Sequence, residues 1–310
     1  MNGILAVDKP KGWTSHDVVA RVRRWSGQRR VGHAGTLDPM ATGVLLVCLG
    51  EATRMSDDLM RGVKWYLARI RFGVRTDTDD ATGQAVEHRP VGFRITDLEG
   101  ALRGQVGNIR QVPPAFAAIK QHGRPVYKAA RAGEVVELAP RSVTVYTIAL
   151  LSLNDAQTEA AAGDSLIHSA DLLISCSKGT YIRSIARDVG EILGCGGHLS
   201  GLRRLASGSI TTANCAGIPT LEEAVAAGGS AALLFHLLPL DLAVSDRPAC
   251  MLGEALEALV RTGRPVSVPV TPPIPDLRVY GASGELAAMA APVGGHLYHP
   301  QRVFAPAGVG

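Results

Sequence analysis

Apolar and polar residues alternate along several stretches of the chain in the pattern of half-buried strands. The clearest stretch is 63–72, where Tyr66 and Ile70 share one face while Arg69 and Arg71 share the other. Other stretches rich in apolar residues, bounded by glycine, proline or polar residues, also predict strands. They lie at 3–8, 44–49, 142–151, 171–177 and 199–210.

Other stretches repeat their apolar residues at helical spacing. At 16–25 three valines fall on one face, most of the arginines lie off it, and Thr14 or Ser15 can cap the first turn. A second helix is expected after Gly179-Thr180, where isoleucines and a valine recur every three or four residues. Further helices are expected at 96–102, at 126–132 and from Thr220, where a capping box is present.

Strands and helices follow one another without a regular βαβ repeat, which favours an α+β fold over a doubly wound sheet. The composition changes at Arg247, after which the chain is rich in proline. There, residues 277–280 and 285–289 flank a Gly-Ala-Ser-Gly turn and predict a hairpin. The tail is therefore expected to form a small, mainly β appendage.

The composition is that of a folded globular protein. Of 310 residues, 46% are hydrophobic and 19% are charged, and no apolar run approaches the length of a membrane helix. The first residues lack the basic and apolar regions of a signal peptide, so we expect a cytoplasmic protein. Five cysteines without a Cys-x-x-Cys pair argue against a disulfide framework and a zinc ribbon.

Positive charge is clustered along the chain. The net charge is only +4, but residues 1–75 hold 13 basic and 6 acidic residues, and residues 103–141 hold 7 and 2. Clusters of this kind are typical of proteins that contact a phosphate backbone. A solvated face with no ligand is the alternative, and charge alone does not decide between them.

Motifs for binding ATP or a dinucleotide, and those of zinc peptidases and serine hydrolases, are absent from the sequence. The informative segment is the loop 32–43, which contains three glycines and a single acid, Asp38, followed by Pro39. The proline restricts the backbone of Asp38, and the glycines let a ligand or another strand approach closely. The alternative is an Asp-Pro turn whose carboxylate caps a local amide.

A second candidate segment, 177–183, has a glycine at a strand-to-helix junction. It places Tyr181 and Arg183 in the predicted first helical turn, where free backbone amides favour an anion. Arg183 can hold a carboxylate by two parallel hydrogen bonds. An ordinary helix start with an exposed arginine is the alternative.

Together these two segments resemble the catalytic loop and the arginine motif of the TruB family of bacterial tRNA pseudouridine synthases. Three further blocks agree with the family: the strand and Lys-Pro turn at 3–12, Tyr66 ahead of 75–78, and 194–205 with its Leu-Arg-Arg-Leu. The resemblance runs in the same order over residues 3–240.

The resemblance implies a mixed, mainly antiparallel central sheet with flanking helices, and isomerisation of uridine 55 in the TΨC loop of tRNA. Asp38 would be the nucleophile acting on a flipped-out base, Arg183 would pair with it, and Tyr66 would stack on the base and assist proton transfer. No cofactor and no metal would be needed. The remaining substrate-binding residues would be His33, Tyr181 and Leu202.

The resemblance also implies how RNA is held. Residues 1–240 would be the catalytic domain, with 103–141 as an RNA-gripping insertion, and residues 247–310 a small PUA-like module. The partner would be the TΨC arm of tRNA, bound by a monomer without guide RNA or membrane, and a secondary role in tRNA folding is compatible with this. The residues expected to meet RNA are Lys9, Lys11, Lys120, Arg124, Lys128, Arg131 and Lys178.

Other functions are weighed against this one. An RNA-binding or RNA-folding helper in which catalysis is secondary would be expected to have lost Asp38, Tyr66 or Arg183, and all three are present. A glycosylase or sugar hydrolase normally uses a second carboxylate, which neither motif offers. A guide-dependent relative is a third possibility, and the insertion at 103–141 favours the stand-alone enzyme.

Overall fold

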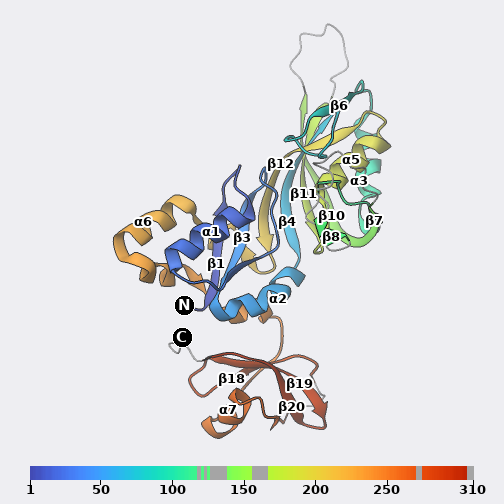
Figure 1. Cartoon of the computed structure of the whole chain (residues 1–310). Coiled ribbons are helices and arrows are strands. Elements are labelled where there is room, and N and C mark those ends of the chain that lie inside the picture. The colour runs from blue at the N-terminus through green and yellow to red at the C-terminus, as the bar shows by residue number, and fades with distance from the viewer. Residues whose placement is uncertain (117–119, 122–123, 126–137, 156–166, 270–273, 306–310) are drawn as a thin grey trace.

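The computed structural model describes residues 1–116, 120–121, 124–125, 138–155, 167–269 and 274–305. One large sheet with helices packed against it forms the main body, and the C-terminal residues form a second, smaller sheet next to α2 (Figure 1). This arrangement confirms the expected α+β class with a small C-terminal β module.

The large sheet runs in the order β14-β1-β3-β12-β4-β11-β10-β7, and β2, β13 and β15 pair at its sides. All neighbours are antiparallel except the pairs β1–β14 and β3–β12. The sheet is therefore mainly antiparallel, as expected. Its strands are β1 (Gly3–Lys9), β2 (Val31–Ala34), β3 (Thr42–Leu49), β4 (Lys64–Phe72), β7 (Gly107–Gln111), β10 (Arg141–Asp155), β11 (Ile167–Cys176), β12 (Gly197–Ser207), β13 (Ile210–Thr211), β14 (Ala216–Gly217) and β15 (Leu237–Leu238).

The central strand β4 shows why its sequence pattern predicts a strand. Its residues are alternately buried and exposed from end to end, so Tyr66 and Ile70 face the core while Arg69 and Arg71 face solvent. The buried face joins the main hydrophobic core together with the valines of α1. A shift of one residue in this register would expose the apolar set, which fixes how β4 pairs with β11 and β12.

Four of the expected helices, including α1 with its capped start, are observed, two of them with shifted starting points, whereas α2 and α7 are not predicted from the sequence. Thr14 caps α1 by accepting a hydrogen bond from the amide of Asp17 at 3.1 Å. Helix α5 begins at Ile182, so Tyr181 is its N-cap residue and not part of the first turn. Helix α6 begins two residues before Thr220, because Pro219 suits a first helical turn. The helices are α1 (Ser15–Ser26), α2 (Ser56–Arg61), α3 (Ile95–Arg103), α5 (Ile182–Ile192), α6 (Ile218–Gly228) and α7 (Glu254–Arg261).

Short elements connect these units. Two small hairpins pair β5 with β6 and β8 with β9. The basic helix expected at 126–132 lies outside the described residues. The short elements are β5 (Val74–Thr76), β6 (Ala85–His88), β8 (Lys120–Gln121), β9 (Arg124–Pro125), and the 3-10 turns η1 (Gly50–Met55), η2 (Thr212–Asn214), η3 (Gly229–His236) and η4 (Leu240–Val244).

The C-terminal sheet has the order β16-β18-β19-β20-β17 and its own hydrophobic core, which includes Leu277 and Tyr298. Its β18–β19 pair is the hairpin expected at 277–289. The strands are β16 (Ala249–Met251), β17 (Val266–Ser267), β18 (Leu277–Tyr280), β19 (Leu286–Gly294) and β20 (Leu297–Val303).

A buried carboxylate joins the two units. Asp58 of α2 is 6% exposed and forms ion pairs with Arg247, in the segment between the sheets, and with Arg302 of β20. Arg54 adds a hydrogen bond to the carbonyl of Val303. The small sheet is therefore docked against η1 and α2.

All five cysteines are free thiols. Among the residues that the structure describes, none of the helices has the length and hydrophobicity needed to span a bilayer.

Candidate active site

The loop between β2 and β3 is held in place by glycine at one end. Gly43 has φ +96°, and a Cβ there would lie 2.2 Å from the carbonyl oxygen of Arg204. This close approach lets the start of β3 pair in parallel with β12. The glycine-rich segment at 32–43 is therefore partly strand, since β2 includes His33, and the remaining loop carries Asp38.

Side chains from the N-terminal part of the chain form hydrogen bonds with backbone groups on the other side of this loop. The Lys9 ammonium donates hydrogen bonds to the carbonyls of Trp13 at 2.6 Å and Pro39 at 3.4 Å. The hydroxyl of Ser15 accepts from the amide of Leu37 at 2.9 Å. These contacts position the residues on both sides of Asp38.

Lys9 corrects one expectation. Its side chain is 0% exposed and its burial lowers its pKa to about 8, so it is not placed to meet an RNA phosphate. The carbonyl groups of the loop need a hydrogen-bond donor, and the Lys9 ammonium supplies it. Sequence alone does not distinguish this buried role of a lysine from a contact with RNA at the surface.

Asp38 and Arg183 lie together although 145 positions separate them in sequence. Arg183 approaches the carboxylate with two nitrogens, Nε at 2.9 Å from Oδ2 and Nη2 at 3.1 Å from Oδ1. The arginine is buried and the aspartate is half-buried. Burial raises the pKa of Asp38 and the charge of Arg183 opposes this rise, so the ion pair keeps a carboxylate available in a desolvated place.

A third charged residue, Asp80, belongs to the same group and is not identifiable from the sequence. Its Oδ2 lies 3.7 Å from Nη1 of Arg183, and its Oδ1 accepts hydrogen bonds from Thr78 and Thr82. Asp80 also contributes to the raised pKa of Asp38. In the sequence it appears only as one member of an acidic turn, and only the packing of α5 shows that it is buried.

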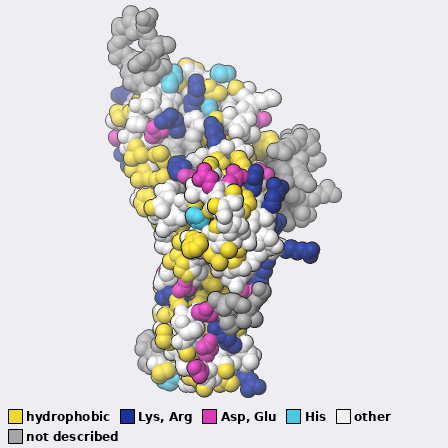
Figure 2. All heavy atoms as spheres, turned by 90° about the vertical axis from the view of Figure 1, so that its left-hand side faces the viewer, with side chains coloured by type: hydrophobic (Ala, Val, Ile, Leu, Met, Phe, Trp, Pro, Cys, Tyr) yellow, Lys and Arg dark blue, Asp and Glu magenta, His cyan; other side chains and the backbone are white. Residues whose placement is uncertain are grey.

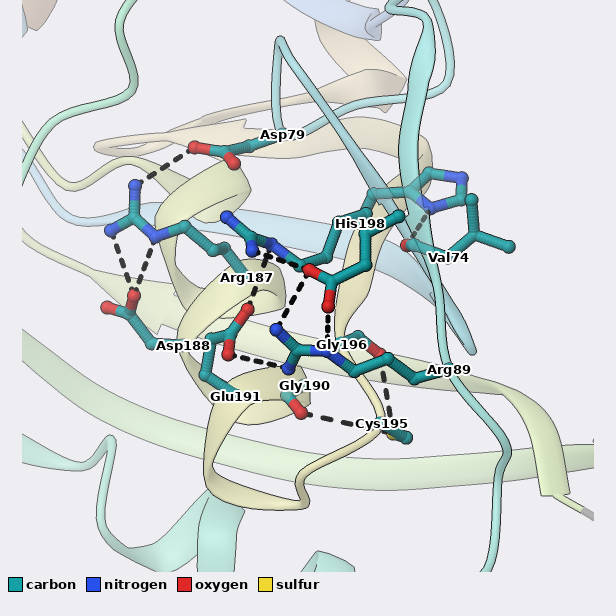
Figure 3. A network of polar contacts seen from close by, with 12 residues as sticks. Val74, Asp79, Arg89, Arg187, Asp188, Gly190, Glu191, Cys195, Gly196 and His198 are labelled. Carbon is teal, nitrogen blue, oxygen red and sulfur yellow. Dashed lines mark hydrogen bonds and ion pairs between the residues drawn. The ribbon is translucent and has the colours of Figure 1, made fainter.

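Helix α5 grips this acidic turn along one face. Arg183, Arg187 and Glu191 are spaced four residues apart and therefore share that face. Arg187 donates to Asp79 at 2.9 Å, and Asp79 has a left-handed backbone with φ 59°. Figure 3 shows Arg187 between Asp79 and Asp188.

The next turn of α5 fixes the neighbouring hairpin β5–β6. Glu191 pairs with Arg89 at 2.9 Å (Figure 3) and with Arg75 at 3.0 Å, and both arginines also pair with Glu87. The four side chains form a closed ring of alternating charge. The turn that carries Asp80 is thus tethered on both sides to the helix that carries Arg183.

Asp38 and Arg183 line a pocket of about 340 Å³. Its walls come from the loop 35–38, the segment 177–183, and strands β4 and β12. A pocket of this size and mixed character is large enough for one flat, partly polar ring. Among the expected site residues, the pocket is lined by Asp38, Tyr66, Lys178, Tyr181, Arg183 and Leu202.

Tyr66 and Tyr181 are the two aromatic rings of the pocket. Tyr66 is 8% exposed and its burial raises its pKa. Tyr181 caps α5, where the side chain of Gln111 receives a hydrogen bond from its amide at 2.8 Å and donates one to its carbonyl at 3.0 Å. Both rings are therefore held by neighbouring strands rather than by flexible loops.

His33 does not line this pocket. Its ring meets that of His16 edge-on, with centroids 5.4 Å apart, and its Nδ1 has no hydrogen-bond partner among the described residues. Burial lowers its pKa. His33 therefore lies beside the site and not at its chemical centre.

The remaining expected RNA contacts are partly placed. Lys11 is exposed at the turn after β1, and Lys178 is exposed at the pocket. Lys120 and Arg124 belong to the hairpin β8–β9. Lys128 and Arg131 lie outside the described residues.

The arrangement is suited to nucleophilic or proton-transfer chemistry on a small ring. A carboxylate oriented by a guanidinium can attack an electrophilic carbon or remove a proton, and an aromatic ring opposite it can stack on the substrate. Within the part of the chain that is described, no cluster of three or more His, Cys, Asp or Glu side chains could hold a metal.

Comparison with known proteins gives a consistent result. Residues 23–182 match the model of the TruB family pseudouridylate synthase N-terminal domain, and residues 183–245 match that of the tRNA pseudouridylate synthase B C-terminal domain. The chain is 42% identical to tRNA pseudouridine synthase B of Ralstonia nicotianae, over 98% of this chain and 94% of that protein. It is 41% identical to the protein of that name from Pseudomonas aeruginosa, over 92% and 90%.

Solved structures resemble this chain in fold. A chain of a crystal structure of a Cbf5-Nop10-Gar1 complex superimposes with a TM-score of 0.72 at 23% identity, over 98% of this chain and 85% of that one. A chain of an H/ACA RNP bound to a substrate RNA containing 2′-deoxyuridine gives a TM-score of 0.72 at 22% identity, over 98% and 85%. At such identities the likeness concerns the fold alone.

Proposed function

The chain belongs to the TruB family of pseudouridylate synthases, and we propose on this basis that it isomerises uridine 55 in the TΨC loop of tRNA to pseudouridine. The observation that supports this most directly is the ion pair of Asp38 and Arg183 inside a pocket that Tyr66 also lines. These are the three residues to which the resemblance in sequence assigns the chemistry.

The proposed chemistry starts at Asp38. Its carboxylate adds to the sugar or the base, or removes a proton from the sugar, and the bond between C1′ and N1 of the uridine breaks. The detached base turns within the pocket, C5 bonds to C1′, and the proton on C5 leaves. Arg183 keeps the carboxylate oriented throughout. Because the product is an isomer of the substrate, the reaction consumes no second substrate.

The target base must first leave the RNA loop. Extruding a base costs a few kcal/mol, which stacking and pocket contacts offset. A pocket of about 340 Å³ between Tyr66 and Asp38 gives the extruded base a place to bind. Leu202 and Tyr181 would complete the walls around it.

We propose that charge and shape hold the rest of the tRNA. Residues 103–141 would grip the RNA, residues 1–240 would act as the catalytic domain, and residues 247–310 as a PUA-like module. On the side that carries α1 and α6, Lys and Arg side chains gather at the right-hand edge at mid-height, among acidic ones (Figure 2). Contacts between such cations and the phosphates of the RNA backbone would make binding strongly dependent on salt. We infer that the enzyme works as a monomer without guide RNA, in the cytoplasm, where tRNA is matured.

A sugar hydrolase is the alternative to consider, because Asp80 supplies the second carboxylate that the sequence motifs do not show. Asp80 is 4% exposed, does not line the pocket, and has its oxygens engaged by Thr78, Thr82 and Arg183. It is therefore not placed to protonate a leaving group. This favours isomerisation over hydrolysis.

Nucleoside analysis of a treated transcript tests the proposal. An unmodified tRNA transcript incubated with the protein alone, without guide RNA, should gain one pseudouridine, and a transcript with cytidine at position 55 should gain none. Conversion at another position would contradict the assigned site. Release of free uracil would point to a glycosylase.

A further inference from the structure

Two consecutive arginines of β12 differ sharply in their surroundings. Arg203 makes two hydrogen bonds to the carboxylate of Asp8, at 3.0 and 2.8 Å. Arg204 is 1% exposed and makes no ion pair within the described part of the chain. A buried charge without a counter-charge is costly, so Arg204 calls for an explanation.

Part of the explanation is structural. Arg204 donates from Nε to the carbonyl of Val44 at 2.6 Å and from Nη2 to the carbonyl of Gly35 at 3.0 Å. These bonds bridge the two ends of the loop that carries Asp38. A neutral donor could also make such bonds, so they do not account for the positive charge.

The strand register places this charge beside Tyr66. In the antiparallel pair β4–β12, Arg204 stands directly opposite Tyr66, and Lys64 lies two residues earlier on the same face of β4. Lys64 is 4% exposed and donates to the carbonyl of Gly62 at 2.5 Å and to that of Leu59 at 3.4 Å. All three side chains line the pocket. Two buried cations and one phenol therefore line the same pocket.

The groups around the Tyr66 hydroxyl act in opposite directions. Burial is the largest influence and leaves the pKa of Tyr66 raised overall, and the charge of Arg204 is the strongest influence that opposes this rise. Cys176 and Asp38 raise the pKa of Tyr66 further. The Lys64 ammonium lies on the same face, and burial lowers its pKa to about 8. Arg204 is thus the main group that favours a negative charge on Tyr66.

We propose that Arg204, assisted by Lys64, is a positioning residue that lowers the cost of ionising the buried Tyr66, so that the Tyr66 phenolate can form and take the C5 proton in the last step of the reaction. The phenol first gives its proton to water. Once C5 has bonded to C1′, the phenolate oxygen takes the proton from C5. The electron pair of the C–H bond then restores the C5–C6 double bond, and Tyr66 returns to a neutral phenol. This inference rests on the proposed function.

The neutral variant Arg204→Gln tests this, because glutamine keeps a donor for the loop and removes the charge. Single-turnover rates are measured with excess full-length protein and a tRNA transcript between about pH 6 and 9.5. We expect a loss of about 100-fold at neutral pH, the lower end of what removing one preorganised electrostatic contact costs. The tRNA affinity should stay within about threefold, and the rising limb of the pH profile should move up by about one pH unit. Arg203→Gln, the matched control, should leave both unchanged.

A double-mutant cycle separates this role from loop positioning. If Arg204 acts through Tyr66, Arg204→Gln should cost little in a Tyr66→Phe background. Equal losses in both backgrounds, or an unmoved pH limb in the single variant, would overturn the proposal. Arg204→Lys keeps the charge and should recover at least tenfold of the rate, whereas a lysine variant as slow as Arg204→Gln would also overturn it.

Two further measurements complete the test. If Arg204→Gln does not fold, Lys64→Gln removes the neighbouring charge and should move the pH limb in the same direction, while an unmoved limb would contradict the proposal. Wild-type protein that binds tRNA and forms no pseudouridine would refute the proposed function itself. That result is distinct from any difference between variants.

Discussion

The substitution Asp80→Asn separates charge from shape at the acidic turn behind the active site. Asparagine has the size of aspartate and keeps an oxygen that can accept the hydrogen bonds of Thr78 and Thr82. It removes only the negative charge that lies 3.7 Å from Nη1 of Arg183. Within the described residues, Arg183 then keeps Asp38 as its only carboxylate partner, beside its hydrogen bond to the carbonyl of Thr78.

The size of the effect can be estimated from this distance. Two unit charges 3.7 Å apart attract by about 4 kcal/mol at an effective dielectric constant of about 20. The net contribution of this ion pair is smaller, about half of that, because both charges also lose solvation on burial. About 2 kcal/mol of lost positioning corresponds to a rate about 30-fold slower. Because Asp80 helps raise the pKa of Asp38, its neutralisation should also lower that pKa.

Single-turnover isomerisation of a tRNA transcript, followed against pH, measures both effects. We expect a plateau about 30-fold lower, with tRNA affinity unchanged, and an acid limb displaced to lower pH, because Asp38 then loses its proton more easily. Asp77→Asn is the matched control, since Asp77 accepts a hydrogen bond from the amide of Gln84 and serves the turn itself. A wild-type rate for Asp80→Asn, or an acid limb displaced to higher pH, would refute the reasoning.

Three other predictions concern stability and binding. Asp58→Ala leaves Arg247 and Arg302 without their buried partner, so the free energy of unfolding should fall by about 3 kcal/mol in urea titrations. Burial would raise the pKa of Asp58, but the two arginines outweigh burial and the pKa is lowered. The difference in unfolding free energy between wild type and Asp58→Ala should therefore shrink as the pH falls below about 4. A constant difference would contradict this. Burial lowers the pKa of Lys64 to about 8, so wild type should gain stability over Lys64→Met as the pH rises from 8 to 10, because the unfolded lysine still binds a proton there; parallel curves would refute this. Neutralising three basic residues of the insertion should weaken tRNA binding and flatten its salt dependence by up to about 0.7–0.9 for each phosphate that is no longer neutralised, and an unchanged slope would exclude phosphate binding there. These residues are Arg124, Lys128 and Arg131.

Much of the fold could be predicted from local patterns. The alternation in β4 and the valine face of α1 appear in the structure as predicted, because burial on one face imposes a period on the sequence. The loop around Asp38 is also identifiable from the sequence, because its glycines and proline determine the local backbone conformation. The glycine junction at 177–183 likewise predicts that Arg183 can hold a carboxylate, but its pairing with Asp38 follows only from the family resemblance, because 145 positions separate the two residues.

Other features depend on tertiary contacts that no local pattern encodes. Asp80 looks like part of a solvated acidic turn until α5 packs on it, and its burial next to Arg183 is then its main property. Lys9 looks like a surface cation, but the carbonyls of two converging loops take its hydrogen bonds. The buried charge of Arg204 is likewise invisible beside Arg203, because only the sheet register shows which of the two faces the pocket.

Tritium release from a tRNA transcript labelled at uridine C5 tests the central claim most directly, with wild type and Asp38→Asn compared side by side and no guide RNA added. The account predicts release by wild type alone, with both proteins binding the transcript equally well. Release by Asp38→Asn at a comparable rate would remove Asp38 from its role, and the absence of release by either protein would contradict the assignment as a stand-alone isomerase.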